Sequence, residues 1–239
     1  MPEISPRISP RFSPDVGRHK REWHRYYSEK RIFHQWTQVH LLQDLPVSRV
    51  LEIGPHLGLV TAMLCNAGYD TVTLDIEECA EPDRHSPKVE RIVGDVRALD
   101  AETLRARRFD AILCCEVLEH LPYETVDSVL DRLAAIGART LVLSVPYMGD
   151  QLTFEFYANR HGWRKYTSLK MFKWLRRFPA PADPTDWEPH KWEIGYAKVP
   201  LADFRALIER RFRVLRTVFT GQCRSVFFVC ENTGAGDRP

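Results

Sequence analysis

The stretch VLEIGPHLG (Val50–Gly58) decides the fold. Its first four residues complete a short apolar run, which predicts a buried strand. The glycines at its end let the backbone turn sharply and let a ligand approach without obstruction by a Cβ atom. Apolar residues at helical spacing follow over Leu59–Ala67, so the segment predicts a strand that turns directly into a helix.

Similar strand-like runs recur along the chain and are separated by crossover segments. We predict strands at Arg49–Ile53, Thr71–Ile76, Val89–Val93, Phe109–Cys114 and Thr140–Val145, with helices at Leu59–Ala67 and Tyr123–Ile136. Short strands that are apolar on both faces are typical of a parallel sheet covered by helices on both sides.

The end of the chain follows a different pattern. A helix at Leu201–Arg211 leads into strands at Phe212–Phe219 and Ser225–Cys230. Strands joined by so short a turn must be antiparallel. The sequence therefore predicts a doubly wound, mostly parallel α/β sheet of seven strands with a C-terminal antiparallel hairpin.

Composition bounds the class of protein. With 239 residues, 44% of them hydrophobic and 28% charged, the chain is typical of soluble globular proteins. Six cysteines are too few for a disulfide scaffold at this length. No window approaches the roughly eighteen apolar residues of a membrane span, and residues 1–7 lack the apolar run of a signal peptide. These features indicate a cytoplasmic protein with reduced thiols.

We predict four segments along the chain. Residues 1–17 form a disordered Pro/Ser/Arg tail, 18–45 a helical segment and 46–231 the main domain, followed by a disordered tail at 232–239. The main domain contains a basic, aromatic insertion at about 147–199. Because it follows the fifth strand, this insertion should stand over the carboxyl ends of the strands, where open α/β sheets bind ligands.

Two acidic residues close the next strands. Asp75 ends the second strand, where a carboxylate can accept both hydroxyls of a ribose. Asp95 follows the third strand within Gly94-Asp95-Val96, where it can accept an adenine amino group. Together with the turn at Gly54, these acids indicate a nucleoside-containing ligand.

With these residues the chain resembles the class I methyltransferases that use S-adenosylmethionine, over about Val47 to Cys230. The resemblance rests on the turn after the first strand, on Asp75 and Asp95, on the EVLEH stretch Glu116–His120 and on the closing hairpin. It implies a Rossmann-like methyltransferase fold, in which Gly54 and Gly58 line the methionine moiety, Asp75 binds the ribose, and Asp95 and Val96 bind the adenine. The cofactor residues it implies are Glu52, Gly54, Pro55, His56, Gly58, Asp75, Ile76, Asp95, Val96, Cys115 and Glu116.

The family's loop usually reads Gly-x-Gly-x-Gly, and here His56 replaces the middle glycine. An NAD-dependent Rossmann enzyme is the competing interpretation. It would show Gly-x-Gly-x-x-Gly, which is absent here, and would not need the final hairpin.

The stretch Glu116-x-x-Glu119-His120 is the next candidate site. If it begins the fourth crossover helix, positions i, i+3 and i+4 share one face. With His190 it resembles the ubiquinone-pathway O-methyltransferases and the small-RNA 3′-terminal 2′-O-methyltransferases. This resemblance implies a divalent metal (Mg, Mn, Fe or Zn) held by Glu116, Glu119, His120 and His190. Metal-free relatives carry similar Glu-His-Leu stretches, and in such a site His120 or His190 would be the catalytic base.

The insertion has four interpretations, and the plainest is a lid helix packed on the domain with its basic side in solvent. Its segment at 168–178 would place Leu169, Phe172 and Leu175 on one helical stripe beside Lys and Arg residues. This predicts a lid over an anionic, amphiphilic or aromatic substrate, or a helix that contacts a membrane surface peripherally. Cations that alternate with aromatic residues also suit single-stranded RNA.

The function predicted is methyl transfer from S-adenosylmethionine to a small molecule, at the oxygen of a hydroxyl, with or without a divalent metal. Two alternatives stay open. One is an RNA methyltransferase of the 2′-O type, and the other is a catalytically silent, methyltransferase-like binding subunit. The chain lacks the Asn/Asp-Pro-Pro-Tyr/Phe tetrapeptide of enzymes that methylate amino groups in nucleic acids.

Overall fold

The computed structural model describes residues 21–76, 89–181, 183, 186–221 and 224–235. Within them, seven strands form one sheet in the order β3-β2-β1-β4-β5-β9-β8. Their bounds are β1 Arg49–Ile53, β2 Asp70–Asp75, β3 Glu90–Val93, β4 Ala111–Cys115, β5 Thr140–Pro146, β8 Phe212–Thr220 and β9 Ser225–Asn232. The first five pair in parallel, whereas β9 pairs antiparallel with both β5 and β8. The predicted fold class is thereby confirmed.

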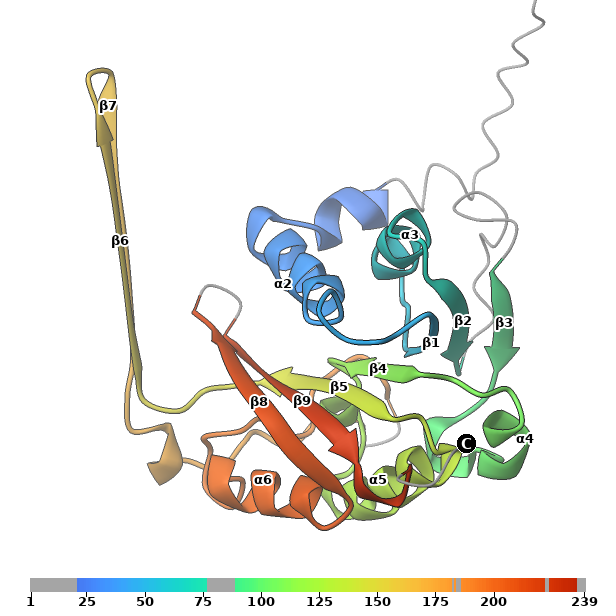
Figure 1. Ribbon diagram of the computed structural model, residues 1–239. Coiled ribbons are helices and arrows are strands. Elements are labelled where there is room, and N and C mark those ends of the chain that lie inside the picture. Colours follow the sequence, from blue (N-terminus) through green and yellow to red (C-terminus); the bar gives the residue numbers. More distant parts are fainter. Residues whose placement is uncertain (1–20, 77–88, 182, 184–185, 222–223, 236–239) are drawn as a thin grey trace, which may run out of the picture.

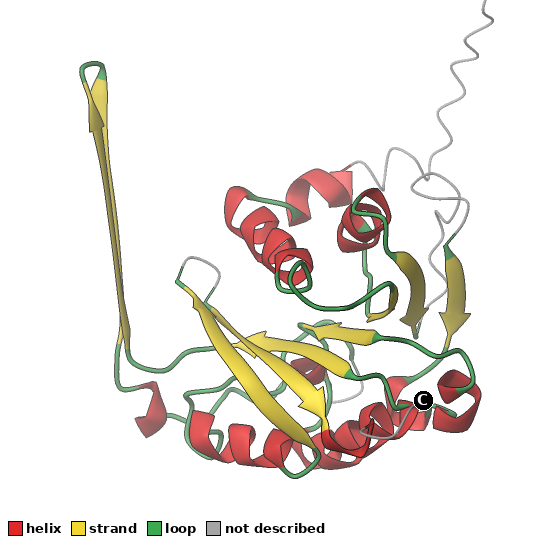
Figure 2. Cartoon of the chain, viewed as in Figure 1, coloured by secondary structure: helices red, strands yellow, loops and turns green. Residues whose placement is uncertain are grey.

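Helices cover both faces of this sheet (Figures 1 and 2). On one face lie α2 (Glu29–His40) and α3 (Leu59–Asn66), and on the other lie α4 (Ala101–Arg105), α5 (Val126–Ile136) and α6 (Leu201–Glu209). Successive strand residues point to opposite faces. In β1, Val50 packs in the core on the α3 side, whereas Leu51 and Ile53 pack in the core on the α5 side.

Element boundaries differ slightly from the prediction, for local reasons. The fourth strand was expected from Phe109, but it begins at Ala111, because the Asp110 carboxylate accepts hydrogen bonds from the backbone N–H groups of Ser48 and Arg49. The helix expected from Tyr123 begins at Val126 and is preceded by a 3-10 turn at Tyr123–Thr125.

At the chain ends, residues 1–20 and 236–239 lie outside the described residues, and with them the predicted tail at 1–17. Residues 21–26 and α2 are helical, in the segment for which helices were expected. Asn232 closes β9 and Thr233–Ala235 form a 3-10 turn, so the ordered chain continues past the predicted start of the C-terminal tail.

The insertion differs most from the prediction. Instead of a helix at 168–178, it contains a long hairpin made of β6 (Gln151–Asn159) and β7 (Gly162–Lys170), followed by a short 3-10 turn at Lys173–Leu175. The helical stripe of Leu169, Phe172 and Leu175 is therefore wrong. The reason is that β6, with its alternation of Leu152, Phe154 and Phe156, pairs with residues up to Lys170, and that Phe172 has a left-handed backbone.

Within the described part of the chain, no helix has both the length and the apolar character that a membrane crossing requires.

Candidate functional site

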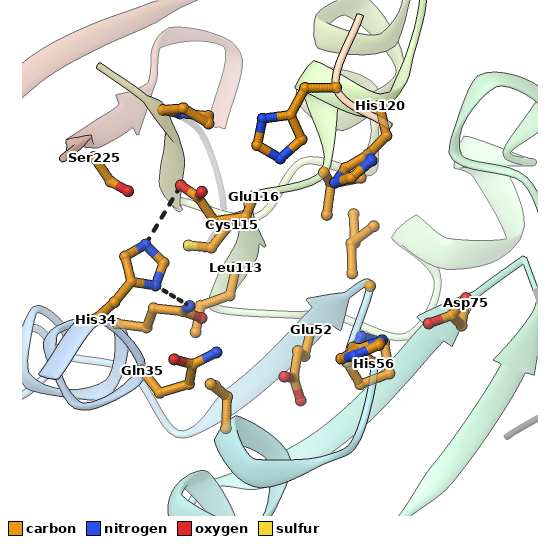
Figure 3. A pocket seen from close by; sticks show the side chains of 18 of the residues that line it. His34, Gln35, Glu52, His56, Asp75, Leu113, Cys115, Glu116, His120 and Ser225 are labelled. Atoms are coloured by element: carbon orange, nitrogen blue, oxygen red, sulfur yellow. Dashed lines mark hydrogen bonds and ion pairs between the residues drawn. The ribbon is translucent and has the colours of Figure 1, made fainter. Parts of the chain in front are cut away.

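A cavity of about 840 Å³ lies at the carboxyl ends of the parallel strands (Figure 3). This is where the topology of an open α/β sheet places a ligand. Most of the predicted site residues line it: Glu52, Gly54, Pro55, His56, Asp75, Ile76, Asp95, Val96, Cys115, Glu116, His120 and His190. Gly58 and Glu119 do not line the cavity, since Gly58 is the N-cap of α3 and Glu119 is fully buried.

The turn between β1 and α3 adopts left-handed backbone conformations. Gly54 has φ +70, and a Cβ atom at this position would meet Cγ2 of Val117 at 2.7 Å. His56, which replaces the family's glycine, also has a positive φ of 50. Its ring packs against Tyr26, with ring centroids 4.4 Å apart, and burial lowers the His56 pKa. The departure from the family's loop is therefore accommodated by a contact with the N-terminal segment.

Glu52 is a buried carboxyl group beside the cavity, and its side chain is only 4% exposed. The Thr61 hydroxyl in α3 donates a hydrogen bond of 2.6 Å to Oε2 of Glu52. Burial raises the pKa of Glu52 to about 7, against the opposing effect of this hydrogen bond. A positively charged ligand would favour its ionised form.

Asp75 and Asp95 lie where the sequence predicts them, at the ends of neighbouring strands. Asp95 caps the 3-10 turn Val96–Ala98 by accepting a bond from the backbone N–H of Arg97, and its carboxylate pairs with the Arg97 guanidinium at 2.6 Å. Hydrogen bonding from Arg97 lowers the pKa of Asp95. The carboxylate is thereby held ionised and can accept a further hydrogen bond.

Cys114 and Cys115 are packing residues in β4. Both are buried, and burial raises the pKa of each thiol above its ordinary value. A protonated, buried thiol is a poor nucleophile. Neither residue has the environment of a catalytic cysteine.

The expected helical face at 116–120 is wrong. Glu116 has φ 55, and only Leu118–His120 form a short 3-10 turn, while the crossover helix starts at Val126. The left-handed residue turns the chain immediately after β4. As a result Glu116 does not join the cluster of Glu119, His120 and His190, although its charge still acts on Glu119. Its carboxylate is held by other partners.

Those partners come from the N-terminal helix and from β5. The Glu116 carboxylate lies 3.4 Å from Nε2 of His34 (Figure 3). It also accepts a 3.0 Å hydrogen bond from the Ser144 hydroxyl. Burial raises the pKa of Glu116, but the hydrogen bond and the charge of His34 hold it below the ordinary value. Sequence analysis missed His34, and with it Tyr26, Tyr27, Arg31 and Gln38, which also line the cavity.

Glu119, His120 and His190 do come together. One ligand atom from each lies within 4.8 Å of the others. The Glu119 side chain is fully buried, and neither of its oxygens has a hydrogen-bond partner among the described residues. Burial, followed by the charge of Glu116, raises the Glu119 pKa well above its ordinary value. An orphaned buried carboxyl group is costly unless something compensates it.

The two histidines are fixed by their Nδ1 atoms. Nδ1 of His120 lies 2.7 Å from the carbonyl oxygen of Trp187, and Nδ1 of His190 lies 2.9 Å from Oε1 of Glu193. A carbonyl oxygen only accepts, so Nδ1 of His120 carries the proton and Nε2 keeps a lone pair. Burial lowers the His120 pKa, which favours this neutral form. Metal-binding histidines use the same arrangement.

The insertion reaches the cavity through the predicted His190 and through residues outside the predicted lid. Met148, Trp187, Glu188, His190 and Glu193 line it, but no described residue of the hairpin does so. The predicted lid formed by 168–178 is therefore not part of the cavity wall.

Comparison with known proteins agrees with this geometry. Residues 20–178, more than half of the chain, match a family model described as a methyltransferase domain. The chain is 30% identical over 112 residues to the ubiquinone biosynthesis O-methyltransferase of Bordetella avium. That match covers 43% of this chain and 43% of the relative, so the chain spans less than half the length of this curated relative.

Solved structures share the fold at low sequence identity. The N-methyltransferase NodS from Bradyrhizobium japonicum, in complex with S-adenosyl-L-homocysteine, has a TM-score of 0.57 and 15% identity, over 91% of this chain and 97% of that one. The 1,6-didemethyltoxoflavin-N1-methyltransferase from Burkholderia thailandensis has a TM-score of 0.53 and 17% identity, over 97% and 98%. The chain belongs to the class I S-adenosylmethionine-dependent methyltransferases, and it is an enzyme of this class.

The residues around the cavity fit this cofactor. Gly54 lines the cavity, and its left-handed backbone, packed against Val117, forms the strand-to-helix turn there. Asp75 and the ionised Asp95 offer acceptors at two strand ends, as a ribose and an adenine amino group require. Glu52 adds a carboxyl group whose ionised form a sulfonium would stabilise.

Proposed function

We propose that this methyltransferase acts on a hydroxyl oxygen of a small-molecule acceptor, with a divalent cation bound by Glu119, His120 and His190. The observation that carries the proposal is the buried Glu119 carboxyl group, which has no hydrogen-bond partner among the described residues and lies beside two histidines. A cation would compensate this carboxylate, which the protein otherwise buries at a cost.

The donor set narrows the metal. One carboxylate oxygen and two imidazole nitrogens suit Mn²⁺, Fe²⁺ or Zn²⁺ better than Mg²⁺, which prefers oxygen ligands. Glu116 lies outside this three-residue cluster, because His34 and Ser144 hold its carboxylate. We therefore assign Glu116 to the cavity wall rather than to the metal site.

Oxygen as the acceptor atom follows from the chemistry of the site. A bound divalent cation lowers the pKa of a coordinated hydroxyl and orients it for attack. The acceptor oxygen then forms a bond to the methyl carbon as the carbon–sulfur bond breaks, which leaves S-adenosylhomocysteine, and the hydroxyl proton passes to a base. The partial match to an O-methyltransferase supports the same atom.

The chain's own residues would supply the remaining steps. Asp75 and Asp95 would orient the cofactor's nucleoside, and the turn at Gly54 would admit its methionine moiety. His120 is neutral, because burial lowers its pKa, and the bond from Nδ1 to Trp187 leaves Nε2 to bind the cation or accept a proton. The same nitrogen cannot do both at once, so the two mechanisms are separable.

Metal binding is tested first without any acceptor. Titration calorimetry with Mn²⁺ should detect one site in the wild-type protein and none in Glu119→Gln, which keeps the shape of the side chain and removes its charge. Glu124→Gln, an exposed carboxylate on the surface, is the matched control and should bind like the wild type. Equal Mn²⁺ affinity in wild type and Glu119→Gln would reject the metal site.

Transfer is tested with labelled S-adenosylmethionine and fractionated cell extract. Chelator should abolish labelling of the small-molecule pool, and Mn²⁺ should restore it. Full labelling in chelator, with an active Glu119→Gln enzyme, would leave a metal-free mechanism with His120 or His190 as the base. Label in the RNA pool would favour the RNA alternative. Cofactor binding without transfer to either pool would favour a silent binding subunit.

A further inference from the structure

The hairpin of β6 and β7 extends from the body of the molecule as an arm (Figure 1). Its two strands, of nine residues each, form a sheet of their own and do not join the main sheet. A two-stranded hairpin alone is marginally stable in water. An arm of this length is therefore expected to pack against another surface.

The two faces of the arm differ in composition. The register places residues 152, 154, 156 and 158 opposite residues 169, 167, 165 and 163 on one face. This apolar face carries five large side chains, and each is at least 60% exposed: Leu152, Phe154, Phe156, Trp163 and Leu169. Phe156 and Trp163 stack on each other, with ring centroids 6.5 Å apart.

The other face is polar and turns toward the body. It carries Thr153, Glu155 and the exposed Tyr157 from β6, and Arg164, Tyr166 and Ser168 from β7. The Lys30 ammonium donates a 3.3 Å hydrogen bond to the Tyr166 hydroxyl. The apolar face therefore points away from the molecule, which reverses the usual arrangement of an amphipathic hairpin and marks an interaction surface.

Positive charge surrounds this apolar face. Residues 160–177 contain seven Lys or Arg and no Asp or Glu: Arg160, Arg164, Lys165, Lys170, Lys173, Arg176 and Arg177. Lys165 lies on the apolar face itself, with its ammonium group 5.7 Å from the centre of the Phe154 ring. Trp174 and Leu175, both more than half exposed, extend the apolar surface beyond β7.

We propose that the apolar face of the hairpin docks on a bilayer surface that contains anionic phospholipid. Aromatic rings are favoured at the membrane–water interface, long cationic side chains can lie along apolar surface with their charges in the headgroup region, and anionic lipids attract Lys and Arg. All three features occur together on this arm.

Two other occupants fit less well. Single-stranded RNA stacks on aromatic rings, but Leu152 and Leu169 occupy the same face and offer no ring. A second copy of the chain would bring its own arm with the same four cations, so arm-to-arm pairing would oppose like charges. An anionic surface that also accepts aliphatic side chains satisfies both constraints.

The experiment is flotation with phosphatidylcholine vesicles, with and without phosphatidylglycerol, at low and high salt. The wild-type protein should float with the anionic vesicles only, and less so at high salt. Lys165→Gln, which removes the cation on the apolar face itself, should weaken binding about fivefold. Arg105→Gln, an exposed cation in α4, is the matched control and should bind like the wild type.

The apolar contribution is tested separately. Phe154→Ser combined with Phe156→Ser should reduce binding at least about tenfold, whereas Leu215→Ser, at a 49% exposed position in β8, should not. Trp163→Phe keeps an apolar ring, so it should retain binding and reduce the quenching of tryptophan fluorescence by brominated lipid. Because Trp163→Phe keeps the fold and the binding, a change in quenching reports only on the contact of residue 163 with lipid.

Four results would overturn the proposal. The first two are no binding to anionic vesicles at low salt, and equal binding to vesicles with and without phosphatidylglycerol. The third is a wild-type protein that dimerises without binding vesicles and that the double serine variant converts to a monomer. The fourth is a protein that binds oligouridylate but not vesicles. Circular dichroism and S-adenosylmethionine affinity of each variant establish that the domain itself is intact.

Discussion

At the scale of single residues, the carboxyl groups in and behind the cavity wall are in opposite protonation states. Arg97 holds Asp95 ionised, whereas burial favours the protonated forms of Glu52 and Glu119. Protonated carboxyl groups are the ones that an incoming cation can ionise, because its charge compensates their burial. The cavity is thereby suited to a cationic cofactor and, at Glu119, to a metal ion.

Glu52 makes this testable through pH. Its pKa is about 7 in the folded protein against 4.5 for the ordinary group, so folding favours the protonated form. The resulting stabilisation is complete below pH 4.5 and is lost as the pH rises through 7. Glu52→Gln removes this loss, so at pH 8 it should be more stable than wild type by on the order of 3 kcal/mol, and at pH 4 it should not be.

Urea unfolding of both proteins at these two pH values measures the difference. Thr61→Val serves as a control that removes the 2.6 Å hydrogen bond but leaves the carboxyl group. Parallel loss of stability with pH in wild type and Glu52→Gln would show that Glu52 does not titrate in this range.

Asp75 tests the cofactor site itself. Asp75→Ala removes a carboxylate acceptor from the end of β2, where a ribose would be bound. Charge-assisted hydrogen bonds contribute about 1.5–3 kcal/mol, so S-adenosylmethionine affinity should fall roughly tenfold to a hundredfold. Titration calorimetry measures the change, and unchanged affinity in Asp75→Ala would contradict the assignment.

Which of these residues the sequence could predict depends on how they are positioned. Asp75 and Asp95 follow from strand ends, since parallel strands bring their carboxyl ends to one edge. The absence of Glu116 from the cluster of Glu119, His120 and His190 goes with a left-handed backbone at Glu116, which no local sequence pattern predicts. His34 comes from a helix packed across the sheet, and helical spacing alone does not show what a helix covers.

At the scale of elements, the turn from β1 to α3 and the segment after β4 fit against each other. Gly54 has φ +70, and Val117 approaches it so closely that a Cβ atom would be 2.7 Å from Cγ2. Gly54 also donates its backbone N–H to the carbonyl oxygen of Leu74, at 2.8 Å. The turn at Gly54 is therefore held in place by β2 on one side and by the segment after β4 on the other.

Gly54→Ala should disturb this arrangement in two ways. The left-handed conformation costs an alanine roughly 1–2 kcal/mol, and the contact with Val117 adds to it. Combining Gly54→Ala with Val117→Ala should relieve the contact but not the backbone strain. The destabilisation by the two substitutions together should therefore be smaller than the sum of their separate effects. A double-mutant cycle measures this difference as a coupling energy, with melting temperature and cofactor affinity as the two readouts.

A coupling energy near zero in this cycle would show that the two side chains are independent. The matched control is Gly68→Ala, which also has a positive φ but no atom within 4 Å of the added Cβ. It should lose stability through the backbone alone and leave cofactor affinity unchanged.

The elements that the sequence predicted best are those with buried, apolar strands. The bounds of β1 agree with the prediction at both ends, because Pro46 precedes the apolar run and Gly54-Pro55 follows it. The prediction for the insertion was wrong, because the aromatic and basic residues at 160–178 are compatible with either a strand or a helix. Pairing with β6 makes part of this segment a strand, and local sequence patterns do not show which segments will pair.

At the scale of the whole molecule, the core and the arm are separate parts. The buried clusters on both faces of the sheet contain residues of the main domain and of the segment around Trp192, but none of the described hairpin residues. The parts of the insertion that reach the cavity, such as His190 and Glu193, return to the sheet through Ile194, which pairs with Tyr147. Cofactor binding and docking therefore depend on different segments.

This separation predicts the effect of removing the arm. Gln151 and Lys170 are paired neighbours at its base, so a short Gly-Ser linker from Asp150 to Met171 can replace the hairpin without moving either end. The shortened protein should unfold cooperatively, with S-adenosylmethionine and Mn²⁺ affinities equal to those of the full chain, because no cavity residue lies within the replaced segment. Differential scanning calorimetry and titration calorimetry measure both properties, with a linker of the same composition inserted at Gly221 of the intact chain as the control. Loss of cofactor binding in the shortened protein alone would mean that the arm supports the cavity, and the division between core and arm would be wrong.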